Sequence, residues 1–286
     1  MLKILSKILS RLSLPTIHRM GKVLGALLNL LTPNTARIQR DNIRQSGLYK
    51  SEAEFELLVK ENIAETGKAI LETLAIWEWS EQEALSKIQS VRNWHLINEA
   101  LARGKGLIFL SPHLGCFEIT PIYYGHHHPV TVLFRPPKKS WIAPMIYAGR
   151  SKGKIKLAPA NTAGVRLLMQ ALKNNEAIGI LPDQNPAAGE GEWAPFFGKS
   201  AYTMSLASKL AEKTGATVIM VYGERLADGR GYIVHFSKLE DHAIATPALL
   251  NHAIEEQIKQ CPTQYYWSYH RYKVSRKAKP QSTATE

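Results

Sequence analysis

The pair of residues best suited to chemistry in this chain is a histidine followed five positions later by a glutamate. His113 and Glu118 lie in the segment 111–118, directly after the apolar run 107–110, which is typical of a buried strand. An imidazole is a base near neutral pH, and a carboxylate on its far nitrogen fixes its tautomer. The chain has no Gly-x-Ser-x-Gly motif, so the hydroxyl that His113 activates is expected to belong to the substrate. We predict that His113 is a general base oriented by Glu118; the alternative is a pair that only caps a helix.

These two side chains can meet only if the chain turns between them. On a single helix, residues five apart point about 140° away from each other. Pro112 ends the strand, and a helix is expected to begin near Leu114 or Gly115. A turn at this place lets His113 and Glu118 converge.

Charged residues also follow two later predicted strands. Arg135 comes directly after the strand 130–134, and Lys138 and Lys139 follow it in a stretch with no acidic residue. Arginine suits bidentate contacts with phosphate, and lysine suits looser ones. Asp183 follows the strand 177–181, where its carboxylate can orient Arg135 or another basic group. We predict that these four residues shape or bind the substrate; the alternative for the lysines is a solvated basic loop.

Three patterns imitate other kinds of site. Gly198-Lys199-Ser200 ends like a phosphate-binding loop, but the nearest preceding glycine has the wrong spacing and no strand comes before it. The triple histidine 126–128, expected on a loop, cannot easily face one ion, so no metal site is predicted. Cys116 is expected to be a small buried thiol rather than a nucleophile.

Strands and helices alternate after residue 103. This alternation predicts an α/β fold with a mostly parallel mixed sheet and helices on both faces, in which ligands bind beyond the carboxyl ends of the strands. The expected strands are 107–110, 130–134, 155–157, 177–181, 216–222 and 232–236, and the expected helices are 51–80, 141–150, 162–173, 203–213 and 247–260.

The chain divides into three parts. Residues 1–100 are expected to form a helical N-terminal region, residues 101–274 an α/β core, and residues 275–286 a polar tail. Within about residues 1–31, apolar side chains recur at helical spacing while Lys3, Lys7 and Arg11 lie on another side. That pattern is typical of an amphipathic helix lying in a membrane interface, and the alternative is a helix packed on the protein's own core.

The charge of the chain favours anionic partners. The formal net charge is +12, and residues 1–50 carry nine Lys or Arg and a single acid, Asp41. A basic terminus suits an anionic lipid surface, where each basic residue contributes about 1 kcal/mol. The two cysteines are far apart and predict neither a disulfide framework nor a zinc site, which fits a reducing compartment.

In sequence order, these motifs resemble the lysophospholipid acyltransferase superfamily, and most closely its lipid A late-acyltransferase branch of lauroyl and myristoyl transferases. The similarity spans nearly the whole chain. It rests on the segment 36–43, the His113-x4-Glu118 block, Arg135-Pro136, Pro182-Asp183-Gln184, the stretch 195–198 with Thr203, and 262–267 with Arg271 and Lys273.

The resemblance implies a fatty acyl donor carried by acyl carrier protein and an acceptor hydroxyl on a 3-hydroxyacyl chain of a phosphorylated lipid A precursor. It also implies a position on the cytoplasmic face of an inner membrane, with no cofactor because the thioester already carries the activation. By position, it makes His113 the base and Glu118 its partner, and it places Arg135 and Asp183 among residues that bind or shape the substrate.

Three rival interpretations stay open from the residues alone. One is a hydrolase, in which water takes the place of the acceptor and thioester cleavage releases free fatty acid. The same chemistry on another lysophospholipid or glycolipid acceptor fits equally well. A non-catalytic protein that binds anionic lipid or RNA through its basic surface would not need His113. Nucleic acid is not an expected partner, since no aromatic and basic RNA-binding signature is present.

Overall fold

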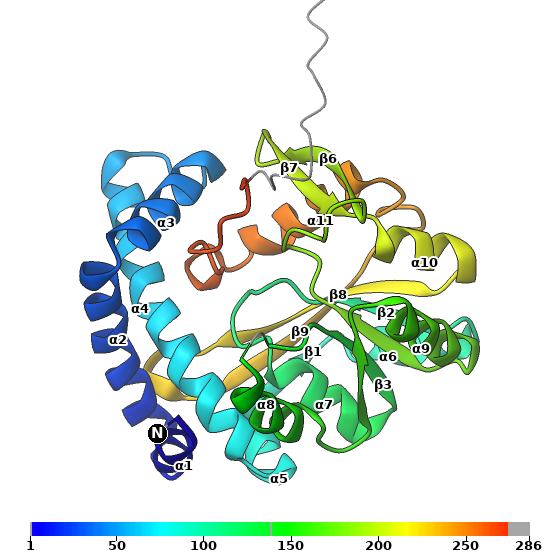
Figure 1. The fold of residues 1–286 in the computed structure, drawn as a ribbon, viewed down its shortest axis with the longest axis horizontal. Coiled ribbons are helices and arrows are strands. Elements are labelled where there is room, and N and C mark those ends of the chain that lie inside the picture. The colour runs from blue at the N-terminus through cyan, green and yellow to red at the C-terminus, as the bar shows by residue number, and fades with distance from the viewer. Residues whose placement is uncertain (1, 138, 274–286) are drawn as a thin grey trace, which may run out of the picture.

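The structure is a computed structural model, and it describes residues 2–137 and 139–273. Lys138 and the predicted tail 275–286 therefore lie outside the described residues. At its centre is a seven-stranded sheet with the order β1-β9-β8-β2-β5-β3-β4 (Figure 1). Its strands are β1 (Ile88–Arg92), β2 (Leu107–Leu110), β3 (Val130–Phe134), β4 (Ile155–Pro159), β5 (Ala177–Ile180), β8 (Thr217–Arg225) and β9 (Tyr232–Lys238).

The sheet is mixed but mostly parallel, as predicted. Neighbouring strands run parallel everywhere except at the β8–β9 pair, which is antiparallel. β2 lies between β5 and β8 and is buried along its whole length. A strand covered on both faces needs apolar side chains at every position, which explains the unbroken run 107–110.

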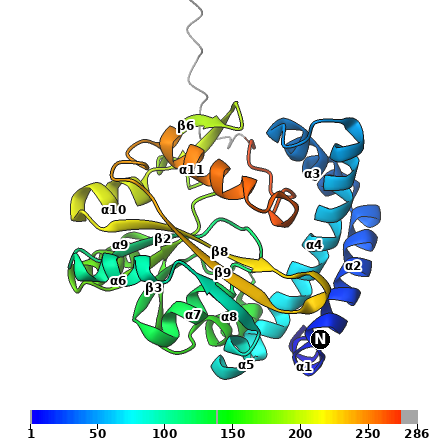
Figure 2. The ribbon, with the colours of Figure 1, turned by 180° about the vertical axis from the view of Figure 1, so that it is seen from behind.

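Helices cover both faces of this sheet, again as predicted (Figures 1 and 2). Alternate residues of β2 enter two different cores, because successive side chains of a strand point to opposite faces. One core includes side chains of α6 (His95–Ala102) and α7 (Ile119–His127), with α8 (Ala143–Arg150) packed against it. The other includes side chains of α9 (Thr162–Lys173), α10 (Leu206–Thr214) and α11 (Pro247–Lys259).

The N-terminal helices form a layer at one side of the molecule, in blue and cyan in Figure 1. They are α1 (Leu2–Ser10), α2 (Leu14–Leu31), α3 (Pro33–Ser46), α4 (Glu52–Glu78) and α5 (Glu81–Leu85). α4 is one continuous helix that fills most of the predicted helical range 51–80. α2 and α4 cross at Gly21, Gly25 and Gly67, where an added Cβ would lie 2.0–2.5 Å from backbone atoms of the other helix. Only glycine allows the two backbones to approach so closely.

A buried charge network joins this layer to the sheet. The Arg225 guanidinium, at the end of β8, pairs with Glu72 and Glu65 of α4. Glu72 also accepts hydrogen bonds from Tyr232 of β9 and contacts His18 of α2. Burial acts to raise the pKa of Glu72, but the charge and hydrogen bonds of Arg225 outweigh it and lower that pKa to about 2. The carboxylate therefore stays ionised and holds helix and sheet together.

Residues 1–100 are mainly helical, and within them residues 88–92 form β1, an edge strand that pairs with β9. Two local expectations were wrong. The helix expected near residue 114 begins at Ile119. Thr203 does not open a helix but lies in a hairpin of β6 (Gly191–Phe196) and β7 (Lys199–Met204). The chain also contains three short 3-10 helices, at Ser140–Ile142, Ala227–Gly229 and Pro262–Gln264.

None of the helices in the described ranges is long and apolar enough to cross a membrane.

Candidate active site

The sheet order brings together two residues that are far apart in the sequence. β2 and β5 are parallel neighbours, so their carboxyl ends meet at the same edge of the sheet. His113 follows the last residue of β2 by three positions, and Asp183 follows the last residue of β5 by three positions. The Ser111 amide donates to the Ile180 carbonyl at 3.0 Å, which continues the strand pairing up to the site.

Asp183 holds His113 at two points. His113 Nδ1 lies 2.9 Å from one carboxylate oxygen of Asp183, and the His113 backbone amide donates to the other at 2.9 Å. A carboxylate only accepts hydrogen bonds, so Nδ1 carries the proton and Nε2 of the neutral ring is the acceptor. Burial acts to raise the pKa of Asp183, but the charge that His113 carries when it is protonated and the hydrogen bonds from its ring and amide keep that pKa below its ordinary value.

The free nitrogen of His113 faces a small polar and aromatic enclosure. Gln184 Nε2 lies 3.2 Å from His113 Nε2 and donates to it, given the tautomer that Asp183 imposes. The Phe117 ring packs edge-on at 4.9 Å between ring centroids, and the Tyr266 ring lies at 6.2 Å. The His113 side chain is 16% exposed, so most of the ring is covered by its neighbours.

Glu118 does not have the neighbour that its spacing predicted. It is buried at the N-cap of α7, and it accepts two hydrogen bonds at 3.0 Å from Nε of Arg150, the last residue of α8. The carboxylate that contacts the His113 ring is that of Asp183. The prediction that a turn brings Glu118 onto His113 was therefore wrong, because Glu118 pairs with Arg150.

The path of the chain between these residues explains the difference. Gly115 has a φ of 60° and pairs with Gly223 of β8, and a Cβ there would lie 2.1 Å from the Gly223 carbonyl oxygen. The Cys116 amide donates to the same carbonyl at 2.7 Å. The loop 111–118 therefore runs along β8 before α7 begins, and this detour carries Glu118 towards α8.

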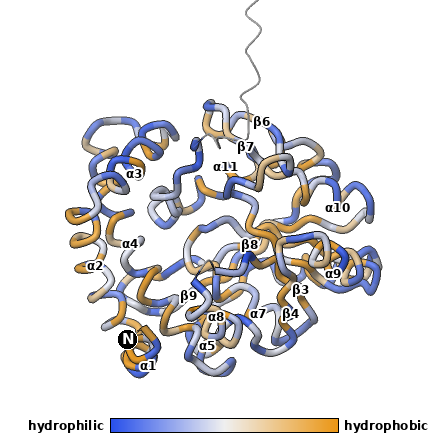
Figure 3. Tube along the Cα trace, in the orientation of Figure 1, coloured by the Kyte–Doolittle hydropathy of each residue, from blue (hydrophilic) through white to orange (hydrophobic). Residues whose placement is uncertain are grey.

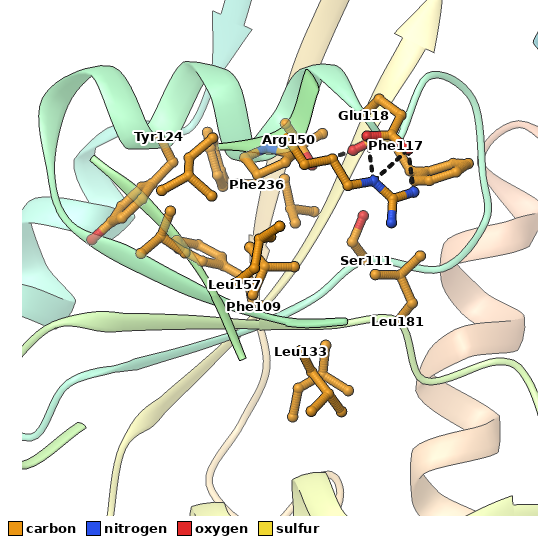
Figure 4. Close-up of a pocket in the computed structure, with 18 residues that line it drawn as sticks. Phe109, Ser111, Phe117, Glu118, Tyr124, Leu133, Arg150, Leu157, Leu181 and Phe236 are labelled. Atoms are coloured by element: carbon orange, nitrogen blue, oxygen red, sulfur yellow. Dashed lines mark hydrogen bonds and ion pairs between the residues drawn. The ribbon is translucent and has the colours of Figure 1, made fainter. Parts of the chain in front are cut away.

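An apolar cavity opens beside this loop, between α7 and the sheet (Figure 4). Figure 4 places Glu118, Arg150, Phe117 and Ser111 together at one end and Tyr124 towards the other. Phe117 lines the cavity and also packs on the His113 ring, so the polar end of the cavity adjoins the base. Its apolar lining is Phe109, Pro121, Tyr124, Val130, Val132, Leu133, Ile155, Leu157, Ile180, Leu181, Val221 and Phe236.

A C-terminal segment, residues 262–273, holds the site from above and is drawn in orange and red in Figure 1. The Tyr266 amide donates to the His113 carbonyl at 3.0 Å, and the Gly115 amide donates to the Gln264 carbonyl at 3.0 Å. Two asparagine amides of the N-terminal layer each donate to two carbonyls of this segment. These are Asn42 of α3 and Asn62 of α4, at distances of 2.7–2.8 Å.

The same segment fixes the loop that carries Asp183. Tyr269 accepts a hydrogen bond from the Asn185 amide at 2.9 Å, and the buried Arg271 donates to the Asn185 side chain at 2.9 Å. Asp183 and Gln184 therefore stand on a loop that is tied down on their C-terminal side.

The predicted basic residues lie elsewhere. Arg135 and Lys139 are exposed beyond the end of β3, and Lys138 is outside the described residues. Asp183 orients a basic group as expected, but that group is His113 and not Arg135. Neither Gln184 nor Arg150 was predicted from the sequence to have a role in the site. Each had one signal: Gln184 directly follows Asp183, and Arg150 ends a predicted helix in a stretch without acids.

Cys116 is buried, and burial raises the pKa of its thiol far above the ordinary value, so it is a poor nucleophile. The triple histidine was wrongly expected on a loop, because His126 and His127 form the last turn of α7. His126 contacts Glu81 at 2.7 Å and His127 packs on Trp94. Within residues 2–137 and 139–273, no group of three histidine, cysteine or acidic side chains is arranged to hold a metal ion.

Comparison with known proteins gives a consistent result. Residues 2–274 match a family described as bacterial lipid A biosynthesis acyltransferase. The chain is 25% identical over 270 residues to the lipid A biosynthesis lauroyltransferase of Escherichia coli (strain K12), covering 92% of this chain and 87% of that one. It is 25% identical over 269 residues to the lipid A biosynthesis palmitoleoyltransferase of the same strain, with the same coverage. It is also 26% identical over 273 residues to a lipid A biosynthesis acyltransferase of Haemophilus influenzae, covering 91% of this chain and 85% of the relative.

Proposed function

The chain belongs to the bacterial lipid A biosynthesis acyltransferase family, and on that premise we propose that it moves a fatty acyl chain from an acyl carrier protein thioester to a lipid A precursor. The acceptor is the hydroxyl of a 3-hydroxyacyl chain. The observation that carries this proposal is the His113–Asp183 pair beside an apolar cavity. A base whose acceptor nitrogen lies beside an apolar cavity that can hold a fatty acyl chain suits transfer of that chain to a hydroxyl.

In the proposed mechanism, the oxygen of the acceptor hydroxyl attacks the thioester carbonyl carbon while His113 Nε2 takes the proton of that hydroxyl. Asp183 keeps the proton on Nδ1 and stabilises the imidazolium that forms. Gln184 leaves Nε2 when the hydroxyl arrives. The carbon–sulfur bond then breaks, and the departing thiolate takes the proton from Nε2. No cofactor takes part, because the thioester is already activated.

The cavity between α7 and the sheet receives the acyl chain. Its lining is almost entirely aliphatic and aromatic, and its polar end carries the Glu118–Arg150 ion pair next to Phe117. Burying each methylene of the chain contributes about 0.8 kcal/mol. The ion pair shapes the opening through which the thioester reaches the base, so we propose that Glu118 acts there rather than on His113.

The N-terminal helices are proposed to lie on the membrane that holds the acceptor, at the cytoplasmic face of an inner membrane. α1 and α2 expose Ile4, Ile8, Val23, Leu27, Leu30 and Leu31, although Leu9 and Ile17 of the same helices are buried in the core. Figure 3 shows apolar residues along both helices at the outer edge of the molecule. Lys3, Lys7, Arg11, Arg19 and Lys22 are exposed beside them. Exposed apolar side chains with a basic surround fit an anionic interface.

The basic residues beyond β3 are proposed to contact anionic groups of the two substrates. Arg135, Lys138 and Lys139 suit the phosphates of the acceptor and the acidic surface of a carrier protein.

The deciding experiment is mass spectrometry of a lipid A precursor after incubation with purified protein and a panel of acyl carrier protein thioesters. We expect the precursor to gain one acyl chain, and His113→Ala to abolish the gain because the base is lost. His252→Ala, an exposed histidine of α11, is the matched control and should retain activity.

Each outcome has a distinct meaning. Full activity of a folded His113→Ala protein contradicts the mechanism. No gain by the wild type on lipid A precursors, with gain on a lysophospholipid or glycolipid in the same assay, replaces the proposed acceptor and keeps the chemistry.

A further inference from the structure

Ser111 presents a buried hydroxyl that the protein itself does not satisfy. Its residue is 8% exposed, and its Oγ has no hydrogen-bond partner among the described residues. A buried polar group without a partner destabilises a protein, because it has lost its hydrogen bonds to water. Such a group in a functional cleft implies a partner that comes with the ligand.

The position of this hydroxyl is specific. Ser111 lines the apolar cavity, and Figure 4 shows its oxygen directed to the end that holds Glu118, Phe117 and Arg150. The other polar groups at that end are engaged: Glu118 pairs with Arg150, and the Thr120 hydroxyl donates to the Phe117 carbonyl at 3.0 Å. Tyr124 also has an unpaired hydroxyl, but it lies towards the other end of the cavity.

Two constraints fix the orientation of Ser111. Its amide is tied to the Ile180 carbonyl, so its backbone continues the edge of the sheet. It stands two residues before His113, whose amide and ring are both bound to Asp183. The hydroxyl and the base are therefore held by the same rigid strand ends, which is the preorganisation that transition-state stabilisation requires.

We propose that Ser111 is a further catalytic residue, whose hydroxyl donates a hydrogen bond to the carbonyl oxygen of the thioester as that oxygen becomes an oxyanion. This inference rests on the proposed acyl transfer. The acceptor oxygen bonds to the carbonyl carbon, His113 Nε2 takes its proton, and the carbonyl π electrons move to the oxygen that Ser111 faces. When the carbon–sulfur bond breaks, the electrons return to form the ester carbonyl, and the thiolate leaves with the proton from Nε2.

The test is Ser111→Ala, with release of the free carrier thiol as the readout. An oxyanion donor acts mainly in the transition state, so kcat should fall by about 100-fold to 1,000-fold. KM should stay within about twofold of the wild-type value, since the ground-state carbonyl gains little from this donor. The variant should be no less stable than the wild type, because it removes an unsatisfied hydroxyl and no contact of the fold.

Ser208→Ala is the matched control. Ser208 of α10 is also buried with an unpaired Oγ, but it lies in the core on the other face of the sheet and not in the cavity. The thermal midpoint of Ser208→Ala should differ from that of the wild type by the same amount as the midpoint of Ser111→Ala does. Its kcat should equal that of the wild type.

The outcomes separate the inference from the proposed function. Thiol release at the wild-type kcat by Ser111→Ala overturns the inference, and so does a raised KM with normal kcat. A lowered thermal midpoint together with lost activity assigns Ser111 a structural role and also overturns it. If the wild type releases thiol without acylating any lipid, the proposed acceptor fails, while the ratio of Ser111→Ala to wild-type thiol release still decides the role of Ser111. Wild-type protein that releases no thiol overturns both.

Discussion

Asp183 fixes which ring nitrogen of His113 carries the proton, so only Nε2 is free to accept one. The carboxylate accepts from both Nδ1 and the backbone amide of His113, so the ring and its strand end are held together. Glu118 lacks this access, since its oxygens face Arg150. In the proposed mechanism, the two acidic residues therefore have different tasks: Asp183 orients the base, and Glu118 shapes the cavity opening.

Exchanging each carboxyl for an amide tests this division. In Asp183→Asn, the amide can donate to Nδ1 and impose the wrong tautomer, so kcat should fall by about three to four orders of magnitude, as in other histidine–carboxylate pairs. In Glu118→Gln, the tautomer is kept, and the loss should be smaller and shared between kcat and KM. Steady-state kinetics with a matched acyl donor series measures both. A larger loss of kcat in Glu118→Gln than in Asp183→Asn would restore Glu118 as the partner of His113.

The sequence identified both members of this pair as site residues but not their partnership. Each was selected because it follows a predicted strand, and that reasoning holds for any parallel sheet. Which strand ends meet depends on the strand order, and β5 lies beside β2 although two strands, β3 and β4, come between them in the chain. A single sequence does not contain that order, so the spacing of five between His113 and Glu118 looked more significant than the spacing of 70 to Asp183.

At the scale of elements, the two faces of β5 have different surroundings. One face packs in a hydrophobic core, and the other borders the apolar cavity. Gly179 faces the apolar cavity beside Val132, and a Cβ built on it would lie 3.3 Å from Val132 Cγ2. Ile178, on the same strand, is fully buried in the opposite core. The absence of a side chain at Gly179 leaves room in the cavity that any larger residue would occupy.

Gly179→Ala should therefore change the preferred length of the acyl chain. The added methyl group takes space from the cavity, so kcat/KM for the longest accepted donor should fall by about threefold to tenfold relative to a donor two carbons shorter. Competition between two acyl carrier protein thioesters, read by mass spectrometry, measures this ratio. Ile178→Val is the control: it should cost about 0.5–1.5 kcal/mol of stability and leave the ratio unchanged. An unchanged ratio in Gly179→Ala would place the acyl chain outside this cavity.

Element boundaries were predicted well where periodicity decides them and poorly where tertiary contacts do. The helix 162–173 was predicted at the residues of α9, which begins with a side-chain cap from Asn161. β1 was missed because its residues alternate weakly and gain their strand form from pairing with β9. The start of α7 was misplaced by four or five residues, because Gly115 and Cys116 contact Gly223. That contact joins segments more than 100 residues apart in the chain.

At the scale of the whole molecule, the N-terminal layer has two different surfaces. Its inner surface is bound to the α/β core through the Glu72–Arg225 ion pair. Asn42 and Asn62 add a second link, since they hold the C-terminal segment 262–273 beside His113. Its outer surface exposes some of the apolar side chains of α2, including Leu27 and Leu30. A layer fixed in this way keeps the candidate active site at a defined distance and angle from its outer surface. If that surface lies on the membrane, as proposed, it sets the direction from which the acceptor arrives.

The outer surface can be tested by charge substitution. Leu27 and Leu30 are 50% and 75% exposed on one side of α2, so the double variant Leu27→Asp/Leu30→Asp should leave the fold intact. It should weaken binding to anionic phospholipid vesicles by about tenfold or more, because two apolar contacts are replaced by charges that the anionic lipid repels. The control is Leu167→Asp/Leu249→Asp, which alters leucines 50% and 42% exposed on α9 and α11 and should bind like wild type. Co-sedimentation across a salt series measures the affinity, and wild-type binding should weaken as salt screens the basic residues. If the α2 variant binds as tightly as its control, the membrane contacts another surface and the direction of acceptor entry proposed for this enzyme is wrong.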